Sequence, residues 1–365
     1  MITPAALVDR KRIERNTQEM SEKMARLGVS LRPHVKTHKC KEAALLQVRG
    51  HDGGITVSTL AEAKGFAQEG FRNITYAYPL PISRLTEIEE LQKQVDRLNL
   101  VLDQEPSLEV LEKRGGSFRV YLKVDCGDHR CGVDPQKKES IALAKRIARS
   151  PVIDFQGILT HGGHSYLCKN EAEIRKAAAE ERDIAVQFAS QLREEGIPVP
   201  EVSIGSTPTM RHVDHLEGVT EVRPGNYVFF DAFQEALGSC SLEEISFSVL
   251  TRIVGTYPEQ NKMIVDAGAL ALSKDAGPTH IDPQCGYGIV CTLEGKPLPE
   301  LKIRTLSQEH GQIFGTEPID WKQFPVGEAL RIIPNHSCLT SALHHLYHLF
   351  DGEEITEAWR PIRGW

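Results

Sequence analysis

The chain has 365 residues, of which 40% are hydrophobic and 25% charged, and its formal net charge is −7. These values are typical of a globular protein and exclude a disordered or fibrous one. Nucleic-acid binding usually requires a basic surface, and neither the net charge nor any stretch of the sequence provides one, so we expect no nucleic-acid partner. The length predicts two domains.

The first residues, MITPAALVDRKRIERN, lack the basic flank and apolar run of a signal peptide. No later stretch approaches the roughly 18 apolar residues of a membrane span. The eight cysteines are spread along the chain without a CxxC pair, which is unlike a disulfide framework. We therefore predict a cytoplasmic protein with no membrane partner, whose cysteines are mostly buried thiols.

Short apolar runs rich in β-branched residues alternate with longer segments of helical period over most of the chain. Such alternation is typical of repeated βα units on a parallel sheet. The predicted strands are 29–31, 55–58, 74–78, 98–103, 118–125, 153–161, 201–205 and 221–230. Eight units within about 200 residues predict an α/β fold of the (β/α)8 TIM-barrel type, in which the chemistry lies on loops at the carboxyl ends of the strands.

After Gln234 the helical period fades, and strand-like segments follow one another between Gly and Pro turns. These segments are 245–258, 262–268, 286–295, 301–311 and 329–334. Pro4–Val8 is also strand-like and is expected to pair with this second domain, and Asp9 is placed to cap the first helix. We therefore predict a TIM barrel over 10–240 and a β-rich domain made of 1–9 and 241–365.

The densest polar segment is RPHVKTHK, which directly follows the first predicted barrel strand and so lies at the predicted active-site face. Lys36 stands in the middle of this segment. Its charged or titratable neighbours are Arg32, His34, His38 and Lys39. Their positive charge should disfavour the ammonium form of Lys36 and free its amine to form an imine. Lys36 is thus the best nucleophile candidate, although a solvated basic loop would also explain the segment.

This segment resembles the lysine segment of the D-serine dehydratases and D-threonine aldolases, a family of fold-type III pyridoxal-phosphate enzymes with an alanine racemase-like barrel. Similar segments run along nearly the whole chain. They are TPAALVD (3–9), VSTLAEAKGFAQEGF (57–71), DCGDHRCGV (125–133), HGGHSYL (161–167), SIGSTPT (203–209), RPGNYVFFD (223–231), VDAGALALSKD (265–275), SQEHG (307–311) and PNHSC (334–338). A short chance match does not explain such a series.

By this resemblance, Lys36 forms the Schiff base with pyridoxal 5'-phosphate and then removes the α-proton of the substrate. Arg130 resembles the family arginine beside the cofactor ring, where a fixed cation can stabilise the phenolate oxygen. Tyr166 resembles a family tyrosine near the ring and the substrate. A surface ion-pair partner is the alternative for the arginine, and a partly buried structural residue is the alternative for the tyrosine.

Two small-residue loops are candidates for the cofactor phosphate, which needs backbone N–H donors. Gly205, Ser206 and Thr207 follow the seventh predicted strand, and Gly225, Asn226 and Tyr227 lie near the eighth. TIM barrels commonly bind phosphate after these two strands. Either loop alone would be an ordinary strand-to-helix turn, so the prediction depends on the pair.

His336 and Cys338 form an H-x-C pair that can place an imidazole nitrogen and a thiolate sulfur on one ion, and this soft ligand set favours zinc. Two residues this far apart on a strand share a face whether or not they bind a metal. The resemblance favours the metal, because the D-serine dehydratase branch carries zinc on such a pair. The aldolase branch typically has H-x-D and prefers harder divalent cations.

The resemblance thus implies a zinc- and pyridoxal-phosphate-dependent dehydratase that converts a D-3-hydroxyamino acid to a 2-oxo acid and ammonia. Candidate substrates are D-serine, D-threonine and D-threo-3-hydroxyaspartate. Alternatives are retro-aldol cleavage to glycine and an aldehyde, an amino-acid racemase, and a non-catalytic pyridoxal-phosphate-binding protein. The family also implies a homodimer. No role is predicted for His161, His164, His212, His215, His310, His344 and His345.

Overall fold

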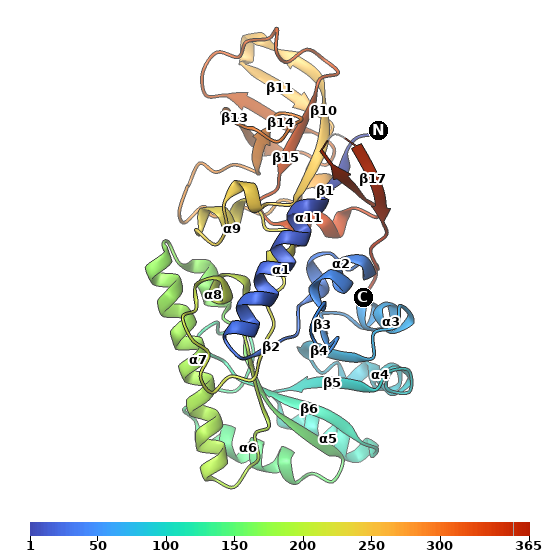
Figure 1. Cartoon of the computed structure of the whole chain (residues 1–365), viewed down its shortest axis with the longest axis vertical. Coiled ribbons are helices and arrows are strands. Elements are labelled where there is room, and N and C mark those ends of the chain that lie inside the picture. The colour runs from blue at the N-terminus through green and yellow to red at the C-terminus, as the bar shows by residue number, and fades with distance from the viewer. Residues whose placement is uncertain (353) are drawn as a thin grey trace. The chain divides into compact units, whose positions relative to one another are not determined.

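The computed structural model describes residues 1–352 and 354–365, which divide into two compact units (Figure 1). The first unit, the barrel, comprises Gln18–Gly225 and Ile362–Trp365. The second unit comprises Met1–Thr17 and Asn226–Pro361. No helix among the described residues is long and apolar enough to cross a membrane.

An eight-stranded parallel sheet forms the barrel, in the order β2-β9-β8-β7-β6-β5-β4-β3. Its strands are β2 (Ser30–Leu31), β3 (Ile55–Val57), β4 (Asn73–Pro79), β5 (Arg97–Leu102), β6 (Phe118–Lys123), β7 (Ile153–Leu159), β8 (Glu201–Ile204) and β9 (Glu221–Val222). A parallel bridge between His34 and Thr56 joins the two edge strands, so the sheet closes on itself. Closure leaves no unpaired edge and brings the carboxyl ends of all strands to one face.

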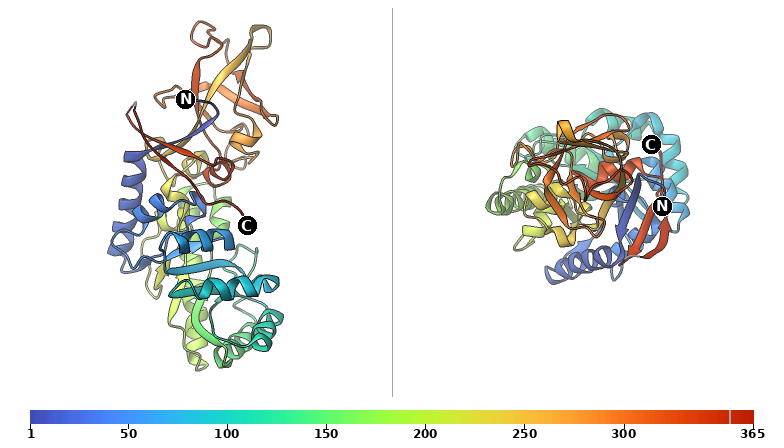
Figure 2. Two further views of the ribbon diagram at one scale, coloured as in Figure 1. Left: turned by 90° about the vertical axis from the view of Figure 1, so that its right-hand side faces the viewer. Right: turned by 90° about the horizontal axis from the view of Figure 1, so that it is seen from above.

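Helices follow the barrel strands and lie outside them (Figure 2). They are α2 (Lys41–Gln47), α3 (Leu60–Gln68), α4 (Leu85–Gln92), α5 (Glu105–Arg114), α6 (Lys138–Arg149), α7 (Glu171–Glu194) and α8 (Thr207–His212), with the 3-10 helices η1 (Val35–Thr37), η2 (Ile82–Arg84) and η3 (Gly163–Leu167). The strands β5 and β6 are buried almost throughout, as expected for parallel strands covered on both faces.

The predicted barrel is confirmed, with one strand much shorter than expected. We predicted a strand over 221–230, but β9 ends at Val222 and a 3-10 helix, η4, occupies Asn226–Val228. Pro224 interrupts the run because proline has no N–H to donate to a neighbouring strand. The β-branched and aromatic residues that follow are buried without being part of the barrel sheet.

The second unit contains a nine-stranded sheet in the order β11-β14-β13-β12-β15-β10-β1-β16-β17. Its strands are β1 (Ala5–Asp9), β10 (Phe247–Tyr257), β11 (Lys262–Val265), β12 (Ile289–Cys291), β13 (Pro297–Leu306), β14 (Gly311–Gly315), β15 (Ala329–Ile333), β16 (Tyr347–Asp351) and β17 (Glu354–Trp359). Its helices are η4, α9 (Ala232–Ala236), η5 (Leu242–Glu244), η6 (Pro258–Gln260), α10 (Ala269–Leu272) and α11 (Ser337–Leu343). The sequence did not predict β14, β16 or β17.

The first strand and helix agree with the sequence. As expected, β1 belongs to the sheet of the second unit, where it pairs with β10 in antiparallel and with β16 in parallel orientation. The helix α1 (Arg10–Arg26) follows at once. Its first turn is capped by Asp9, whose Oδ1 accepts a hydrogen bond from the backbone N–H of Arg12 at 3.0 Å.

A β-bulge in β7 depends on Gly157. The pairing of β6 with β7 shifts between Val120 and Tyr121, which leaves Gln156 as an extra residue. Gly157 has φ +128, and a Cβ at this position would lie 2.0 Å from the carbonyl oxygen of Glu201 on β8. Both the backbone conformation and the neighbouring strand therefore require glycine here.

We expect Gly157→Ala to lower the free energy of unfolding by roughly 3 kcal/mol or more, because backbone strain and a clash with fixed backbone add together. Gly116→Ala is the matched control, since Gly116 has φ +97 but its Cβ would come no closer than 3.8 Å to Phe118. This control should cost only about 1 kcal/mol. Chemical denaturation measures both, and equal losses would contradict the role of the bulge.

Candidate active site

A cavity of about 360 Å³ opens at the carboxyl ends of the barrel strands. This is within the range of small-molecule sites in proteins. Its lining consists of His34, Lys36, Ser58, Ala77, Tyr78, Pro79, Val101, Lys123, Arg130, Cys131, Leu159, His161, Gly205 and Arg223. Four of these side chains are lysine or arginine, and none of the described lining residues is aspartate or glutamate. The cavity is therefore suited to a ligand with several negative charges.

Lys36 lies in η1, directly after β2, and lines the cavity while half-buried. The turn is formed locally, because Nδ1 of His34 accepts a hydrogen bond from the backbone N–H of Lys36 at 3.5 Å and so caps the 3-10 helix. His34 also takes part in the bridge that closes the barrel. The lysine predicted from the sequence is thus held by backbone that cannot shift without opening the sheet.

Of the four neighbours that the sequence suggested for Lys36, His34 lines the cavity with it, while the other three have partners elsewhere. Arg32 is buried and ion-paired with Glu221. Nζ of Lys39 pairs with Glu62 at 3.0 Å. The imidazole of His38 is also buried, and its Nε2 bonds to the side-chain oxygen of Gln47 at 2.8 Å.

Lys123 and Arg223 are cationic residues of the cavity that sequence reasoning missed. Lys123 is the last residue of β6, and it is 6% exposed. Burial, and then the charges of Arg223 and Arg130, lower the pKa of Lys123 to about 8. The signal in the sequence was a lysine at the end of a mostly apolar strand, since residues at such positions point towards the active-site face of a barrel.

Two histidines of the lining, His34 and His161, are neutral. Burial, followed by the positive charge of Lys36, places the pKa of each well below its usual value. Nδ1 of His161 lies 3.2 Å from the carbonyl oxygen of Gly205. Because a carbonyl only accepts hydrogen bonds, Nδ1 carries the proton and Nε2 is left as an acceptor. The sequence had assigned no role to His161.

Arg130 lines the cavity, as its predicted role requires, and its Nε also lies 3.5 Å from Asp128. The surface ion pair that was its alternative is therefore present as well. Tyr166 is half-buried in η3 and is not one of the described residues that line the cavity. Its role beside a cofactor stays a prediction.

The backbone of the Gly205–Thr207 loop is already engaged within the protein. The N–H of Gly205 donates to Oε1 of Glu181 at 2.8 Å, and the N–H of Ser206 donates to Oγ1 of Thr209 at 3.0 Å. Ser206 is the N-cap of α8, and with Thr209 it forms a capping box. Two of the three amides predicted to bind phosphate thus have protein acceptors, and the phosphate role of this loop stays a prediction.

The second predicted phosphate loop divides between the two units. Gly225 ends the barrel unit, where a Cβ would lie 2.6 Å from the carbonyl oxygen of His34, so close packing requires glycine. Asn226 and Tyr227 begin the second unit, and Tyr227 is fully buried. The side-chain amide of Asn226 donates to Oδ2 of Asp231 at 2.7 Å. The phosphate role of Gly225, Asn226 and Tyr227 stays a prediction.

His336 and Cys338 lie at the start of a helix, not on the strand assumed from the sequence. His336 is the N-cap of α11, and Cys338 lies in its first turn. The two side chains are within hydrogen-bonding reach of each other. Among residues 1–352 and 354–365, no group of three or more His, Cys, Asp or Glu side chains is placed to hold a metal ion. A metal at this pair would thus take its other ligands from elsewhere.

Polar partners hold both members of the pair within the second unit. Nδ1 of His336 lies 3.3 Å from Oδ2 of Asp275. Burial alone would lower the pKa of His336, but hydrogen bonds to Asp275 and Cys338 raise it well above its usual value. The amide of Asn226 points to Sγ of Cys338 at 3.6 Å. Such outer contacts typically orient metal ligands.

Comparison with known proteins agrees with this architecture. Residues 8–232 match the family described as alanine racemase, N-terminal domain, and residues 246–350 match the putative serine dehydratase domain. The fold and the cavity thus define a barrel enzyme of the alanine racemase type with a serine dehydratase domain. The alanine racemase of Bacillus anthracis, at 14% identity and a TM-score of 0.70 over 99% of this chain and 98% of its own, shares the fold.

The chain belongs to the family of D-serine dehydratases and D-threonine aldolases, which are pyridoxal-phosphate-dependent lyases. It is 39% identical to a D-serine dehydratase of Dictyostelium discoideum, covering 100% of this chain and 97% of that protein. It is 36% identical to the solved D-threo-3-hydroxyaspartate dehydratase of Delftia sp. HT23, with a TM-score of 0.95 over 100% of this chain and 98% of that one. The resemblance stated from the sequence is confirmed.

Glu181 on α7 provides a test of how the cavity loop is supported. Its carboxylate is fully buried and also accepts a hydrogen bond from Oγ1 of Thr209 at 3.0 Å. Burial raises the pKa of Glu181 above its ordinary value of 4.5, partly offset by the bonds from Gly205 and Thr209. The pKa of Glu181 is thus higher in the folded than in the unfolded state. Its contribution to stability is therefore complete below pH 4.5 and is lost as the pH rises through the folded-state pKa.

We therefore expect Glu181→Gln to remove part of the stability loss that the wild type shows as the pH rises from 4.5 through the folded-state pKa of Glu181. Glutamine does not titrate but can still accept from Gly205 and donate to Thr209. Denaturation curves across this range measure the effect. Glu180→Gln, at an exposed position of the same helix, should leave the pH profile as it is. Parallel profiles for the wild type and Glu181→Gln would contradict the prediction.

Proposed function

We propose that this protein is a zinc- and pyridoxal-phosphate-dependent dehydratase that converts a D-3-hydroxyamino acid to a 2-oxo acid and ammonia. The observation that carries the proposal is Lys36 in a cavity with three further cations and two neutral histidines. Relatives named as D-serine and D-threo-3-hydroxyaspartate dehydratases, at 39% and 36% identity, support the reaction class. D-serine, D-threonine and D-threo-3-hydroxyaspartate are the candidate substrates.

The residues of the cavity fit pyridoxal phosphate. Lys36 would hold its aldehyde through the side-chain amine, and Lys123, Arg130 and Arg223 offer positive charge to its phosphate and phenolate groups and to the carboxylate of a substrate. When bound, this cofactor draws electrons away from the α-carbon of an amino acid. In the Gly205–Thr207 loop, which we propose for the phosphate, the amides of Gly205 and Ser206 also have acceptors within the protein.

The chain itself would move the proton. The amine of Lys36 would take the proton from the α-carbon of the substrate. The neutral His161 offers Nε2 as an acceptor inside the same cavity, and the neutral His34 keeps the turn of Lys36 in place. Loss of the α-proton and of the 3-hydroxyl as water leaves an enamine, which takes up water to give a 2-oxo acid and ammonia. For D-serine the product is pyruvate.

The donor set of His336 and Cys338 fits zinc, since imidazole nitrogen and thiolate sulfur are ligands that zinc prefers. Coordination to zinc makes hydroxide a better leaving group. Solved structures of the Delftia enzyme include a metal-free form of a cysteine-to-alanine variant. Cys338 favours the dehydratase over the aldolase reaction, in line with the pattern predicted from the sequence. Cytoplasmic location and a homodimer stay predictions.

The first test is to incubate the protein with pyridoxal phosphate, zinc and each of the three candidate substrates, and to assay 2-oxo acid and glycine together. We expect 2-oxo acid and ammonia. Lys36→Ala should reduce the rate by at least about 10²- to 10⁴-fold and abolish the visible absorbance of lysine-bound cofactor, because no other side chain replaces both roles.

Lys41→Ala, which removes an exposed lysine paired with Glu69, is the matched control and should keep full activity. Glycine and an aldehyde in place of the 2-oxo acid would show retro-aldol cleavage, and inversion of the α-carbon alone would show a racemase. Binding of the cofactor without turnover of any substrate would show that the protein is a non-catalytic pyridoxal-phosphate-binding protein.

Metal binding can be tested apart from activity. We expect Cys338→Ala to lower the zinc content of the purified protein and to weaken zinc affinity by roughly 10-fold or more, since a thiolate ligand is lost. Cys285→Ala is the control, because Cys285 is another partly exposed thiol of the second unit, with Sγ donating to the carbonyl oxygen of Ala276. Elemental analysis and calorimetric titration with zinc provide the measurement. Equal zinc binding by both variants would rule out the pair as the metal site.

A further inference from the structure

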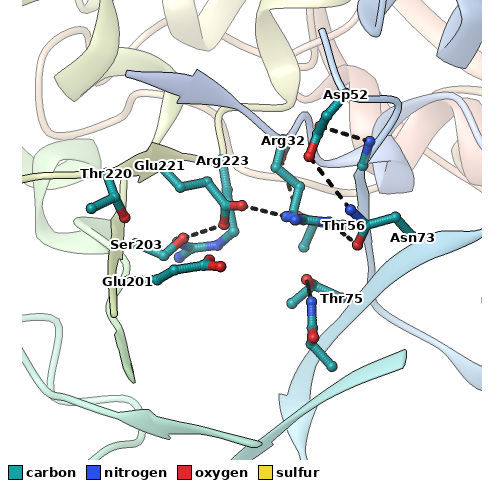
Figure 3. A network of polar contacts seen from close by, with 12 residues as sticks. Arg32, Asp52, Thr56, Asn73, Thr75, Glu201, Ser203, Thr220, Glu221 and Arg223 are labelled. Carbon is teal, nitrogen blue, oxygen red and sulfur yellow. Dashed lines mark hydrogen bonds and ion pairs between the residues drawn. The ribbon is translucent and has the colours of Figure 1, made fainter. Parts of the chain in front are cut away.

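Inside the barrel, a row of polar contacts ends at Arg223 (Figure 3). Glu221 accepts a hydrogen bond from Nε of Arg32 on one side and, on the other, from the hydroxyl of Ser203 at 2.6 Å. The Ser203 hydroxyl in turn accepts from Nη1 of Arg223. Ser203 therefore links a carboxylate inside the barrel to a guanidinium that lines the cavity.

The guanidinium of Arg223 is held at both terminal nitrogens. Nη1 donates to Ser203, and Nη2 donates to the carbonyl oxygen of Thr160. Arg223 is 5% exposed, Glu221 4% and Ser203 0%. Buried polar groups whose partners are all in place hold a single geometry. The guanidinium of Arg223 is thus held in place at the cavity by residues that are not part of the described cavity lining.

Charge as well as geometry depends on Glu221. Arg32 and Arg223 are both buried cations, and Glu221 is the carboxylate that bonds to one directly and to the other through Ser203. Burial lowers the pKa of Arg223, and the charge of Glu221 is the largest influence opposing that change. Without the carboxylate of Glu221, the two buried guanidinium groups would lack its compensating negative charge, which is unfavourable in the barrel interior.

A second carboxylate in the barrel, which is half-buried, serves as an internal comparison. Glu201 lies on the neighbouring strand β8 and accepts a hydrogen bond from the hydroxyl of Tyr121. Similarly, Thr75 on β4 is a fully buried hydroxyl that accepts from the amide of Asn99 at 3.0 Å. Neither group bonds to a residue of the cavity in the contacts that the structure describes. Thr75 therefore matches Ser203 in burial, and Glu201 matches Glu221 in charge, without a connection to Arg223.

We propose that Glu221 and Ser203 are positioning residues that hold Arg223 as a fixed cation at the Lys36 cavity and thereby set how tightly the cavity binds pyridoxal phosphate. The inference rests on the proposed function for the identity of the ligand. A cation fixed beside lysine-bound cofactor also favours the deprotonated form of that linkage over the protonated one. The row of contacts is therefore expected to influence the visible spectrum of the holoenzyme as well as the affinity.

The test compares Ser203→Ala with Thr75→Val, each of which removes one buried hydroxyl. We expect Ser203→Ala to weaken the binding of pyridoxal phosphate by roughly 10-fold, the size typical of losing a hydrogen bond to a charged group. The midpoint of the pH titration of the visible band should move to higher pH, because a less fixed cation favours the deprotonated form less. Ser203→Thr, which keeps the hydroxyl, should restore both values.

Thr75→Val should leave the affinity and the titration unchanged, even if both variants melt at a lower temperature. Should Ser203→Ala fail to fold, Glu221→Gln is compared with Glu201→Gln, since each variant removes one carboxylate charge inside the barrel and keeps an acceptor. We expect only Glu221→Gln to shift the affinity and the titration.

Failure of the positioning role and failure of the proposed function give different results. If the wild type shows a visible band that Lys36→Ala abolishes, and Ser203→Ala and Glu221→Gln behave like their controls, the positioning role is wrong while the proposed function stands. If the wild type shows no band dependent on Lys36, the proposed function is wrong, and the inference falls with it.

Discussion

The concentration of positive charge at the carboxyl ends of the barrel strands is the constraint on which the site depends. Lys36, Lys123, Arg130 and Arg223 line one cavity without an acidic side chain among the described lining residues. Like charges this close disfavour one another, and burial lowers the pKa of Lys123 to about 8. The arrangement is most stable with an anionic ligand present, which explains why such a site belongs to an enzyme with a phosphorylated cofactor.

The interior of the barrel contributes to this site rather than merely supporting it. TIM-barrel interiors are usually filled by apolar side chains. Here Arg32, Glu221 and Ser203 form a buried polar layer whose hydrogen bonds continue to the cavity through Arg223. A buried network is favourable only when its members have partners. The stability of the barrel and the geometry of the cavity are therefore coupled through the same contacts.

Local sequence patterns do not show which partner a group finds elsewhere in the fold. The Gly205–Thr207 loop has the composition of a phosphate loop, yet its Gly205 amide bonds to Glu181, which is 24 residues away in sequence. The H-x-C pair suggested a shared strand face, but His336 caps a helix. Spacing alone does not distinguish these cases, because the competing acceptors and the backbone conformation are not local properties.

The sequence by itself determined the barrel, the second β-rich unit, the attachment of the first strand to that unit and the place of Lys36 after the first barrel strand. Hydrophobic periodicity and strand-ending turns are local, so a single chain carries them. Only the tertiary structure decided that Arg32 is neutralised by Glu221, 189 residues away, and that Lys123 and Arg223 join Lys36 at the cavity. Closure of the barrel creates these neighbours, and no local pattern contains the distances between strands that meet only when the sheet is closed.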